Sequence, residues 1–313
     1  NADGELNGTL GETPEGATPT TGVTQAAGQA LVAQIAAGPV EATLVLDQLI
    51  EERRTWNIVV ETGRGRADNV VMMGAHLDSV QDGPGINDNG TGSATLLETA
   101  VQLKKQTKRL DNKVRFAWWG AEELGLLGST YYVNDLVAND PRALDDIAVY
   151  LNYDMVGSPN YRLGVYDADG SGEPTDAPVP AGSIETENAF REFFDKVGQP
   201  VVDTQFSGRS DYQAFIFNEV AAGGLFTGAD GVKTEEEVEL FGGEAGITYD
   251  PNYHSADDNL ANVNRTALTI MSNAIAHMTA ELGASTVAID VPSGGRFKAR
   301  RVPATLPEGV SRR

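Results

Sequence analysis

The chain has 313 residues, of which 41% are hydrophobic and 22% charged, and its formal net charge at pH 7 is −22. These values are typical of a globular protein with a large core, and so acidic a surface argues against nucleic-acid binding because it repels phosphate backbones. The chain has no cysteine, which excludes disulfides, thiolate metal ligands and a cysteine nucleophile.

We interpret the negative charge mainly as an acidic surface that keeps the protein in solution. The alternative is that it attracts metal cations or cationic peptides. No stretch is long and apolar enough to predict a membrane span. The first 19 residues are polar and rich in Gly and Thr, with no signal peptide. The chain therefore looks processed or cut from a longer one.

The N-terminal segment contains two predicted elements. Apolar residues at helical spacing predict a helix over Gln25–Ala37. Residues 40–46 suit a strand. This is too little material for an independent hydrophobic core.

From Trp56 onward the pattern alternates between strands and helices. Strands are predicted at 57–61, 69–74, 113–119, 148–152, 161–166 and 220–226, and helices at 93–105, 126–137, 185–197 and 264–282. Such alternation predicts an α/β fold, a three-layer sandwich around a mostly parallel mixed sheet. Residues 285–313 are rich in Pro, Gly and Arg, and we expect a surface or disordered tail there.

Ionisable residues follow three of the predicted buried strands. His76 and Asp78 follow the first, Glu122 and Glu123 the second, and Asp154 the third. Because α/β folds bind ligands beyond the carboxyl ends of their strands, we expect the active site to lie at this edge of the sheet.

Two loops add further candidates. Asp88 lies in a loop flanked by Gly85 and Gly90, and His254 lies in the loop Tyr253-His254-Ser255. Imidazoles and carboxylates without thiolates suit zinc, manganese or cobalt. Five ligands suffice for a pair of metal ions if one carboxylate bridges them, and the remaining acid, Glu122, is then free to move protons. The candidate ligands are His76, Asp88, Glu123, Asp154 and His254.

Each candidate also has an ordinary explanation when it is taken alone. A single histidine more often packs in the core or lies on the surface, and His277, inside the last predicted helix, is interpreted as structural. Glu122 and Glu123 suit the start of the helix that follows them. Asp88 suits a turn. These explanations weaken because all of them would have to hold together in one chain.

Five motifs in order resemble those of the M28 family of zinc aminopeptidases, and the similarity is closest to its secreted bacterial enzymes of the Streptomyces griseus type. The similarity runs from about Asn57 to Leu282, and it implies a secreted, extracellular protein. It is carried by Gly74-Ala75-His76-Leu77-Asp78-Ser79-Val80, Gly85-Ile86-Asn87-Asp88-Asn89-Gly90-Thr91-Gly92, Phe116-Ala117-Trp118-Trp119-Gly120-Ala121-Glu122-Glu123-Leu124-Gly125-Leu126, Asn152-Tyr153-Asp154-Met155-Val156-Gly157 and Tyr253-His254-Ser255.

The resemblance implies an aminopeptidase that hydrolyses the N-terminal bond of peptides with a free N-terminus, using two zinc ions and a bridging water, with cobalt or manganese as substitutes. His76 and Asp154 would hold one zinc, Glu123 and His254 the other, and Asp88 would bridge them. Three further residues have implied roles: Asp78 orients His76, Glu122 is the general base and acid, and Tyr253 binds the oxyanion. Arg209 matches a substrate-contacting arginine.

The sequence departs from the family pattern at two places. Some secreted relatives have a disulfide around the last histidine, where this chain has Asn252 and Asp257. The family's N-terminal helix region is missing, and residues 21–31 instead resemble the end of a protease-associated (PA) domain. We therefore expect a PA-domain remnant at 1–50, the peptidase domain at 51–284 and a tail at 285–313.

Three alternative functions remain open at this stage. A glutaminyl cyclase of the same fold would use one zinc, and a dinuclear carboxypeptidase would accept a blocked N-terminus. A binding domain of this fold would have lost its catalysis. The intact set of five ligands and Glu122 favours the aminopeptidase. The sequence does not predict the oligomeric state.

Overall fold

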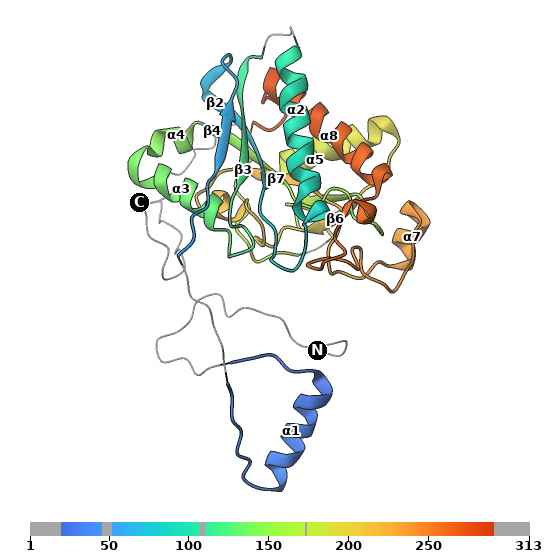
Figure 1. The fold of residues 1–313 in the computed structure, drawn as a ribbon. Helices are drawn as coiled ribbons and strands as arrows, with labels where there is room; N and C mark the ends of the chain where they lie inside the picture. Colours follow the sequence, from blue (N-terminus) through green and yellow to red (C-terminus); the bar gives the residue numbers. More distant parts are fainter. Residues whose placement is uncertain (1–19, 46–51, 107–109, 173, 291–313) are drawn as a thin grey trace. The chain divides into compact units, whose positions relative to one another are not determined.

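A computed structural model describes residues 20–45, 52–106, 110–172 and 174–290 of the chain (Figure 1). These residues fall into two units, with residues 20–45 in the first and residues from 55 to 290 in the second. The second unit carries all the candidate site residues.

The first unit contains helix α1, Gln25–Ala37, at the predicted bounds. The Thr24 hydroxyl caps it by accepting a hydrogen bond from Ala27 N at 3.2 Å, and the helix has no buried residue. The predicted strand at 40–46 is wrong for residues 40–45, which form no strand, and residue 46 lies outside the described residues. A strand needs a partner for its backbone groups, and the described part of this unit offers none.

The described residues of the second unit form a seven-stranded sheet in the order β1-β3-β2-β4-β7-β5-β6. The pairs β1–β3 and β5–β7 are antiparallel and the other neighbours are parallel. The predicted mostly parallel mixed sheet is thus confirmed. The strands are β1 Ile58–Glu61, β2 Arg66–His76, β3 Asn112–Trp119, β4 Ile147–Tyr153, β5 Gly164–Asp167, β6 Val202–Gln205 and β7 Ala222–Phe226.

Helices cover both faces of this sheet and complete the three layers (Figure 1). One layer contains α2 Gly92–Lys105, α5 Ser183–Val197 and α8 Arg265–Ala284. The other contains α3 Leu127–Asn139, α4 Pro141–Asp145 and α6 Gln213–Ile216. Asn264 caps α8, because its Oδ1 accepts hydrogen bonds from Thr266 N and Ala267 N at 3.0 and 3.1 Å.

Each face of the sheet has its own hydrophobic core. Leu96 of α2, Phe194 of α5 and Met271 of α8 pack with the residues of one face. On the other face Trp119 and Phe215 are central, and the Phe215 ring stacks on Tyr150 with centroids 4.0 Å apart. Burial of so many large side chains on both faces fixes which side of each strand faces which layer.

Strand register brings the three predicted strand ends to one level. Gly74 of β2 pairs with Ala117 of β3 and with Asn152 of β4, and His76 pairs with Trp119. The residues that follow β3 and β4 therefore emerge beside His76. This register explains why segments that are far apart in sequence meet at one edge of the sheet.

Several elements were not predicted from the sequence. They are β6 and the short helices α4, α6, α7 Glu235–Phe241 and the 3₁₀ turn Leu260–Asn262. The β6 sequence Val-Asp-Thr-Gln lacks a hydrophobic run, and this strand pairs only with β5. Its conformation depends on that tertiary pairing more than on local propensity.

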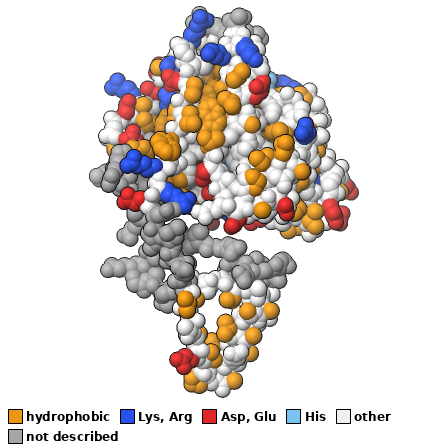
Figure 2. All heavy atoms as spheres, viewed as in Figure 1, with side chains coloured by type: hydrophobic (Ala, Val, Ile, Leu, Met, Phe, Trp, Pro, Cys, Tyr) orange, Lys and Arg blue, Asp and Glu red, His pale blue; other side chains and the backbone are white. Residues whose placement is uncertain are grey.

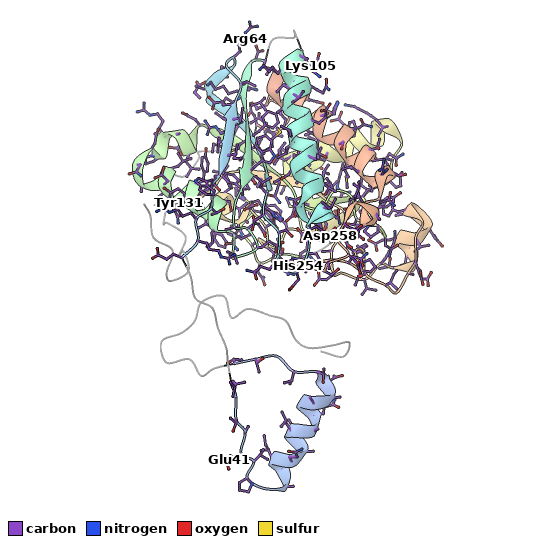
Figure 3. The ribbon with its side chains drawn as sticks, in the orientation of Figure 1. Glu41, Arg64, Lys105, Tyr131, His254 and Asp258 are labelled. Atoms are coloured by element: carbon purple, nitrogen blue, oxygen red, sulfur yellow. The ribbon has the colours of Figure 1, made fainter. Side chains whose placement is uncertain are left out.

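Charge is unevenly distributed over the surface of the second unit. Lysine and arginine side chains gather at the end of this unit where Arg64 and Lys105 lie, and acidic ones at the opposite rim, toward His254 and Asp258 (Figures 2 and 3). Hydrophobic side chains lie together near α2 and the adjoining strands (Figure 2). Within the described ranges we find no helix with the length and hydropathy that a bilayer crossing requires.

Candidate metal centre

His76 is the last residue of β2, and its side chain is 1% exposed. Its Nε2 lies 3.1 Å from Asp88 Oδ1 and 3.1 Å from Asp154 Oδ1. Its Nδ1 lies 3.1 Å from the backbone oxygen of Asp78 and 3.9 Å from the Asp78 carboxylate. The backbone of Asp78 is therefore the nearer group that orients this ring, and Nε2 is directed at two carboxylates.

Asp88 lies in a helical turn, Ile86–Thr91, that leads into α2. Gly85 begins this turn with a left-handed φ of 61°, and an added Cβ there would collide with the backbone oxygen of Asp88. The side chain of Asn89 ties the turn to β4, because Nδ2 donates to the backbone oxygen of Tyr153 at 3.0 Å and Oδ1 accepts from Met155 N at 3.2 Å. The Asp88 carboxylate is thus held level with the end of β4.

Glu122 and Glu123 follow β3 after Gly120 and Ala121, as predicted. The Asp78 carboxylate accepts hydrogen bonds from their backbone N–H groups, at 3.0 Å from Glu122 and 3.3 Å from Glu123. Asp78 therefore fixes the backbone of both glutamates, in addition to contacting His76. Ala121, which precedes them, has a left-handed φ of 57°, a conformation that persists only where the surroundings support it.

Asp154 directly follows β4. Its Oδ1 contacts His76, and its Oδ2 accepts a hydrogen bond from the Ser210 hydroxyl at 2.7 Å. Ser210 also receives a hydrogen bond from Asn152 Nδ2 at 2.9 Å. Each oxygen of this carboxylate thus has a defined orientation.

His254 comes from a loop rather than from a strand end, and its side chain is 37% exposed. Its Nε2 lies 3.1 Å from Asp88 Oδ2 and 3.0 Å from Glu123 Oε2. Tyr253 stacks on it, with ring centroids 3.7 Å apart. The structure therefore brings all five sequence-predicted ligands together, and Asp88 offers a different oxygen to each imidazole.

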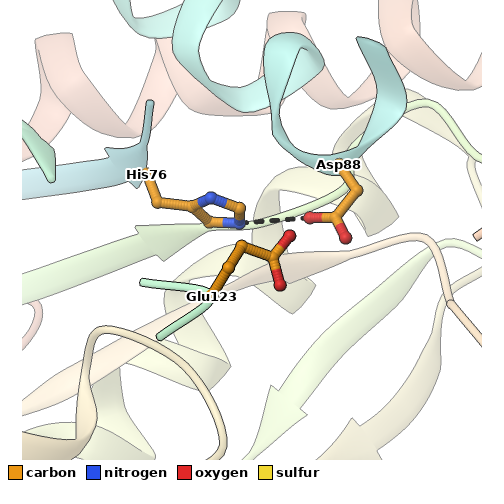
Figure 4. A group of neighbouring side chains, drawn as sticks. All are labelled: His76, Asp88 and Glu123. Atoms are coloured by element: carbon orange, nitrogen blue, oxygen red, sulfur yellow. Dashed lines mark ion pairs between the residues drawn. The ribbon is translucent and has the colours of Figure 1, made fainter. Parts of the chain in front are cut away.

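The donor set fits divalent metal ions. His76, Asp88 and Glu123 present ligand atoms within 4.8 Å of one another (Figure 4). The ligand atoms of His76, Glu122 and Asp154 lie equally close together. Glu123 Oε1 is buried and has no hydrogen-bond partner among the described residues. Burying a carboxylate oxygen without a partner costs free energy unless a cation binds it. Nitrogen and carboxylate donors of this kind suit zinc.

The pKa values of both histidines are raised by the carboxylates that surround them. Burial alone would lower the pKa of His76, but Asp154 and Asp88 raise it well above its ordinary value. For His254, burial again lowers the pKa, and Asp88 and Glu123 outweigh it, so that the pKa reaches about 10. The acids thus favour cations at both imidazole positions, and a metal ion would compete with protons for them.

Glu122 has the environment of a group that exchanges protons. Burial raises its pKa well above the ordinary value; His76 offsets part of this effect, and the negative charges of Asp154 and Asp211 add to it. A raised carboxyl pKa brings proton transfer nearer to neutral pH. The role of Glu122 as general base and acid stays a prediction.

Asp211 is a buried acid that the sequence analysis did not single out. Burial raises its pKa to about 7, and the charges of Asp154 and Asp78 contribute to the increase. It lies in the segment after β6, and that strand was also missed. In this segment only Arg209 is a predicted site residue, because nothing in the local sequence indicates that Asp211 is buried.

A cavity of about 420 Å³ opens beside these residues. Its polar wall contains the site residues His76, Asp88, Glu122, Glu123 and Asp154, together with Tyr253 and the exposed Arg209. Its remaining wall includes the apolar or aromatic side chains Met155, Phe226, Val232 and Tyr249. The cavity is thus polar at the candidate metal centre, and beyond it polar side chains such as Thr204, Gln205 and Asp230 lie among the apolar and aromatic ones.

A match to the model of peptidase family M28 covers residues 57–279. The chain belongs to peptidase family M28. Among curated proteins, this M28 chain is 51% identical over 285 residues to "Probable leucine aminopeptidase 2" of Arthroderma benhamiae, and the match covers 91% of the chain and 56% of that protein. It is 48% identical over 310 residues to "Leucine aminopeptidase 2" of Trichophyton equinum, covering 99% and 61%.

Solved structures agree with the M28 fold. A zinc aminopeptidase from Bacillus subtilis matches with a TM-score of 0.64 at 23% identity, covering 93% of this chain and 64% of that one. An aminopeptidase from Aneurinibacillus sp. strain AM-1 matches with a TM-score of 0.65 at 25% identity, covering 91% and 61%. Membership of this family implies zinc as the metal.

The M28 chain spans between 56% and 61% of the length of these two curated relatives. The predicted family is confirmed. The likeness to the Streptomyces enzymes, the PA-domain remnant and the domain boundaries at 50 and 284 stay predictions.

A second acidic group lies outside the cavity. Asp167, Asp169 and Glu187 also have oxygen atoms close together. Their oxygens accept hydrogen bonds from backbone N–H groups, for example from Ala168 to Glu187 at 2.8 Å and from Gly172 to Asp167 at 2.9 Å. These bonds describe a turn stabilised by its own side chains.

Proposed function

We propose that this chain is the catalytic part of a zinc-dependent aminopeptidase that removes the first residue from peptides with a free N-terminus. The observation that carries the proposal is the position of Asp88, whose two oxygens each lie 3.1 Å from the Nε2 atom of a different histidine. A carboxylate that faces two imidazoles in this way suits a pair of metal ions that share it as a ligand.

In this proposal His76 and Asp154 hold one zinc ion, Glu123 and His254 hold the other, and Asp88 contacts both. The contacts of His76 with Asp154 and of His254 with Glu123 support this division. Bound zinc would lower the pKa of a water molecule and polarise the scissile carbonyl. Cobalt or manganese are candidate substitutes, because they accept the same nitrogen and oxygen donors.

Glu122 accepts the proton of the attacking water and delivers it to the leaving amine. Its place on the cavity wall and its raised pKa support this role. Tyr253 is proposed to donate its hydroxyl to the oxyanion, since burial and the surrounding acids raise its pKa and keep it protonated. Arg209 is proposed to contact the substrate from the cavity rim.

Substrate selection follows from the two walls of the cavity. The acidic groups Glu122 and Asp154 suit the free ammonium group of a peptide. The apolar wall with Met155 and Phe226 suits a bulky aliphatic first residue, and the names of the curated relatives support leucine as that residue. We further propose that the protein acts outside the cell, where an acidic and cysteine-free chain needs no reducing environment.

Hydrolysis of leucine anilide by the zinc-loaded chain tests the proposal. We expect turnover that a chelator abolishes and that added zinc restores, with about two zinc ions per chain at full activity. An N-acetylated leucine peptide is the matched substrate control and should resist cleavage. Cleavage of the blocked peptide, or full turnover in the presence of the chelator, would contradict the proposal.

The alternative functions are not favoured. A glutaminyl cyclase from an Acidobacteriales bacterium shares the fold with a TM-score of 0.53 at 18% identity, a likeness that concerns the fold alone. The curated relatives with about half of their aligned residues identical are leucine aminopeptidases. A non-catalytic binding domain does not require a buried glutamate with a raised pKa, such as Glu122, on the cavity wall.

A further inference from the structure

A buried polar cluster joins the Asp88 turn to the His254 loop. It is formed by Asn87, Asp250, Asp258 and Asn262, each no more than 5% exposed. Asp258 does not line the cavity beside the metal centre. His254 and Asp258 nevertheless lie close together at the same edge of the molecule (Figure 3).

Asp258 binds the backbone of the Asp88 turn at three consecutive residues. Its backbone oxygen accepts from Ile86 N at 3.0 Å. Its carboxylate accepts from Asn87 N at 2.8 Å through Oδ1 and from Asp88 N at 3.0 Å through Oδ2. One residue therefore holds the three N–H groups that set the position of the Asp88 side chain.

The same cluster holds the loop that carries His254. Asn262 Nδ2 donates to both oxygens of Asp250 at 3.0 Å and to Asp258 Oδ1 at 3.1 Å. Asp250 accepts from Asn252 N at 2.9 Å through Oδ1 and from Tyr253 N at 3.2 Å through its backbone oxygen. The loop from 250 to 258 thus begins and ends within the cluster.

His254 needs such support because its backbone is not in a relaxed conformation. Its φ is 55°, in the left-handed region that residues other than glycine rarely adopt. Such a conformation persists only where neighbouring contacts enforce it. The loop has no cysteine, and Asn252, one of the two residues at the disulfide positions of some relatives, donates to Asn262 Oδ1 at 2.8 Å.

We propose that Asp258 is a positioning residue that sets the separation between the Asp88 carboxylate and the His254 imidazole, and so forms the second zinc position. This inference rests on the proposed dinuclear zinc function. Asp258 binds the Asp88 turn with its carboxylate and ends the loop that presents His254. A shift of Asp258 therefore changes both ligands of the shared position together, while His76 and Asp154 stay on their strands.

The variant Asp258→Asn tests this inference, because an amide oxygen accepts only one of the two N–H groups and its NH₂ group faces the other. Isothermal titration of the metal-free full chain with zinc should show one equivalent weakened by about 10–100-fold and the other unchanged. The absorption spectrum of the cobalt-loaded variant should change at the same equivalent.

Glu187→Gln is the matched control. Glu187 Oε2 also accepts two consecutive backbone N–H groups, from Ala168 at 2.8 Å and Asp169 at 3.2 Å, but away from the cavity. Both variants should lower the melting temperature, and only Asp258→Asn should change zinc binding. If the two variants lose stability alike and both bind zinc like the wild type, Asp258 is merely structural and the inference is wrong.

A crystal structure of the metal-free Asp258→Asn chain separates this inference from the proposed function. We expect the distance between His254 Nε2 and Asp88 Oδ2, 3.1 Å here, to increase whether or not the enzyme uses two zinc ions. An unchanged distance overturns the inference, whereas failure of the wild type to bind two zinc ions overturns the dinuclear function. If Asp258→Asn does not fold, Asn262→Ala gives the same readouts, because it removes the donor that links Asp250 to Asp258 and the acceptor of Asn252, and leaves the Asp258 carboxylate in place.

Discussion

The two histidines of the candidate metal centre are held in different ways. His76 ends the central strand β2, is 1% exposed, and takes its position from the registers β2–β3 and β2–β4. His254 lies on a loop, is 37% exposed, and takes its position from side-chain hydrogen bonds centred on Asp250 and Asp258. A regular sheet places the half of the site around His76, which we call the strand side. A polar cluster places the half around His254, which we call the loop side.

This difference indicates which changes each half tolerates. Positions on the strand side are fixed by many backbone hydrogen bonds and by the cores on both faces, so that single polar substitutions there change chemistry more than geometry. Positions on the loop side depend on a few polar contacts, and the loss of one contact changes geometry directly. The following predictions, from the largest expected effect to the smallest, test this division.

Glu122→Gln should lower turnover by up to about 10⁴-fold, because the amide cannot accept the proton of the attacking water. The variant should keep its bound zinc and its melting temperature, since the strand side keeps its geometry. Steady-state kinetics on leucine anilide and metal analysis measure these quantities. Turnover within a few fold of the wild type would contradict the proposed role of Glu122. The strand side would then position the metal ligands without taking part in proton transfer.

His76→Ala and His254→Ala should each weaken zinc binding by more than about 100-fold, the upper range for residues that only support ligands. Their effects on the metal-free chain should differ. Removal of the His76 ring leaves Asp154 and the buried Oδ1 of Asp88 without their cationic partner, while Asp88 Oδ2 keeps His254; the loss for a buried pair is about 3–5 kcal/mol. Removal of the half-exposed His254 should cost less because solvent screens its partners. Equal losses of unfolding free energy in urea for the two variants would contradict this difference between the strand side and the loop side.

The strand side of the site was predictable from the sequence. The apolar runs before His76, Glu122 and Asp154 predict buried strands, and the rule that α/β sites lie at the carboxyl ends places these residues together. The register that brings them level depends on packing against α2 and α8, which a single sequence does not reveal.

The loop side was predictable only through resemblance. Nothing in the local pattern around Tyr253-His254-Ser255 places it near Asp88, because the contact joins residues about 170 positions apart through Asp258. Asp258 and Asn262 read as ordinary loop residues, and the predicted strand at residues 40–46 shows how weak short patterns are without their tertiary partners.

Asp211 lies on the strand side, and its environment contrasts with that of Asp258. Burial raises the pKa of Asp258, but hydrogen bonds from the backbone N–H groups of Asp88 and Asn87 and from Asn262 offset part of this increase. Asp211 is buried near the negatively charged Asp154 and Asp78, and its pKa rises to about 7. The strand side thus contains an acid whose charged form opposes folding.

Asp211→Asn should therefore change the pH dependence of stability in the metal-free chain. The folded-state pKa exceeds the unfolded value of about 3.9, so the stability from the protonated carboxyl is fully present below that value and is lost as pH rises through about 7. The amide has no such loss. Between pH 5 and 6 the variant should gain about 1.4 kcal/mol on the wild type in urea unfolding with a chelator present. Asp195→Asn, at an exposed position of α5, is the control for the removal of one carboxylate. If the free energies of unfolding of Asp211→Asn and the wild type change with pH in parallel, neighbouring groups already compensate the buried charge of Asp211. The polar groups of the strand side would then be paired as fully as those of the loop side.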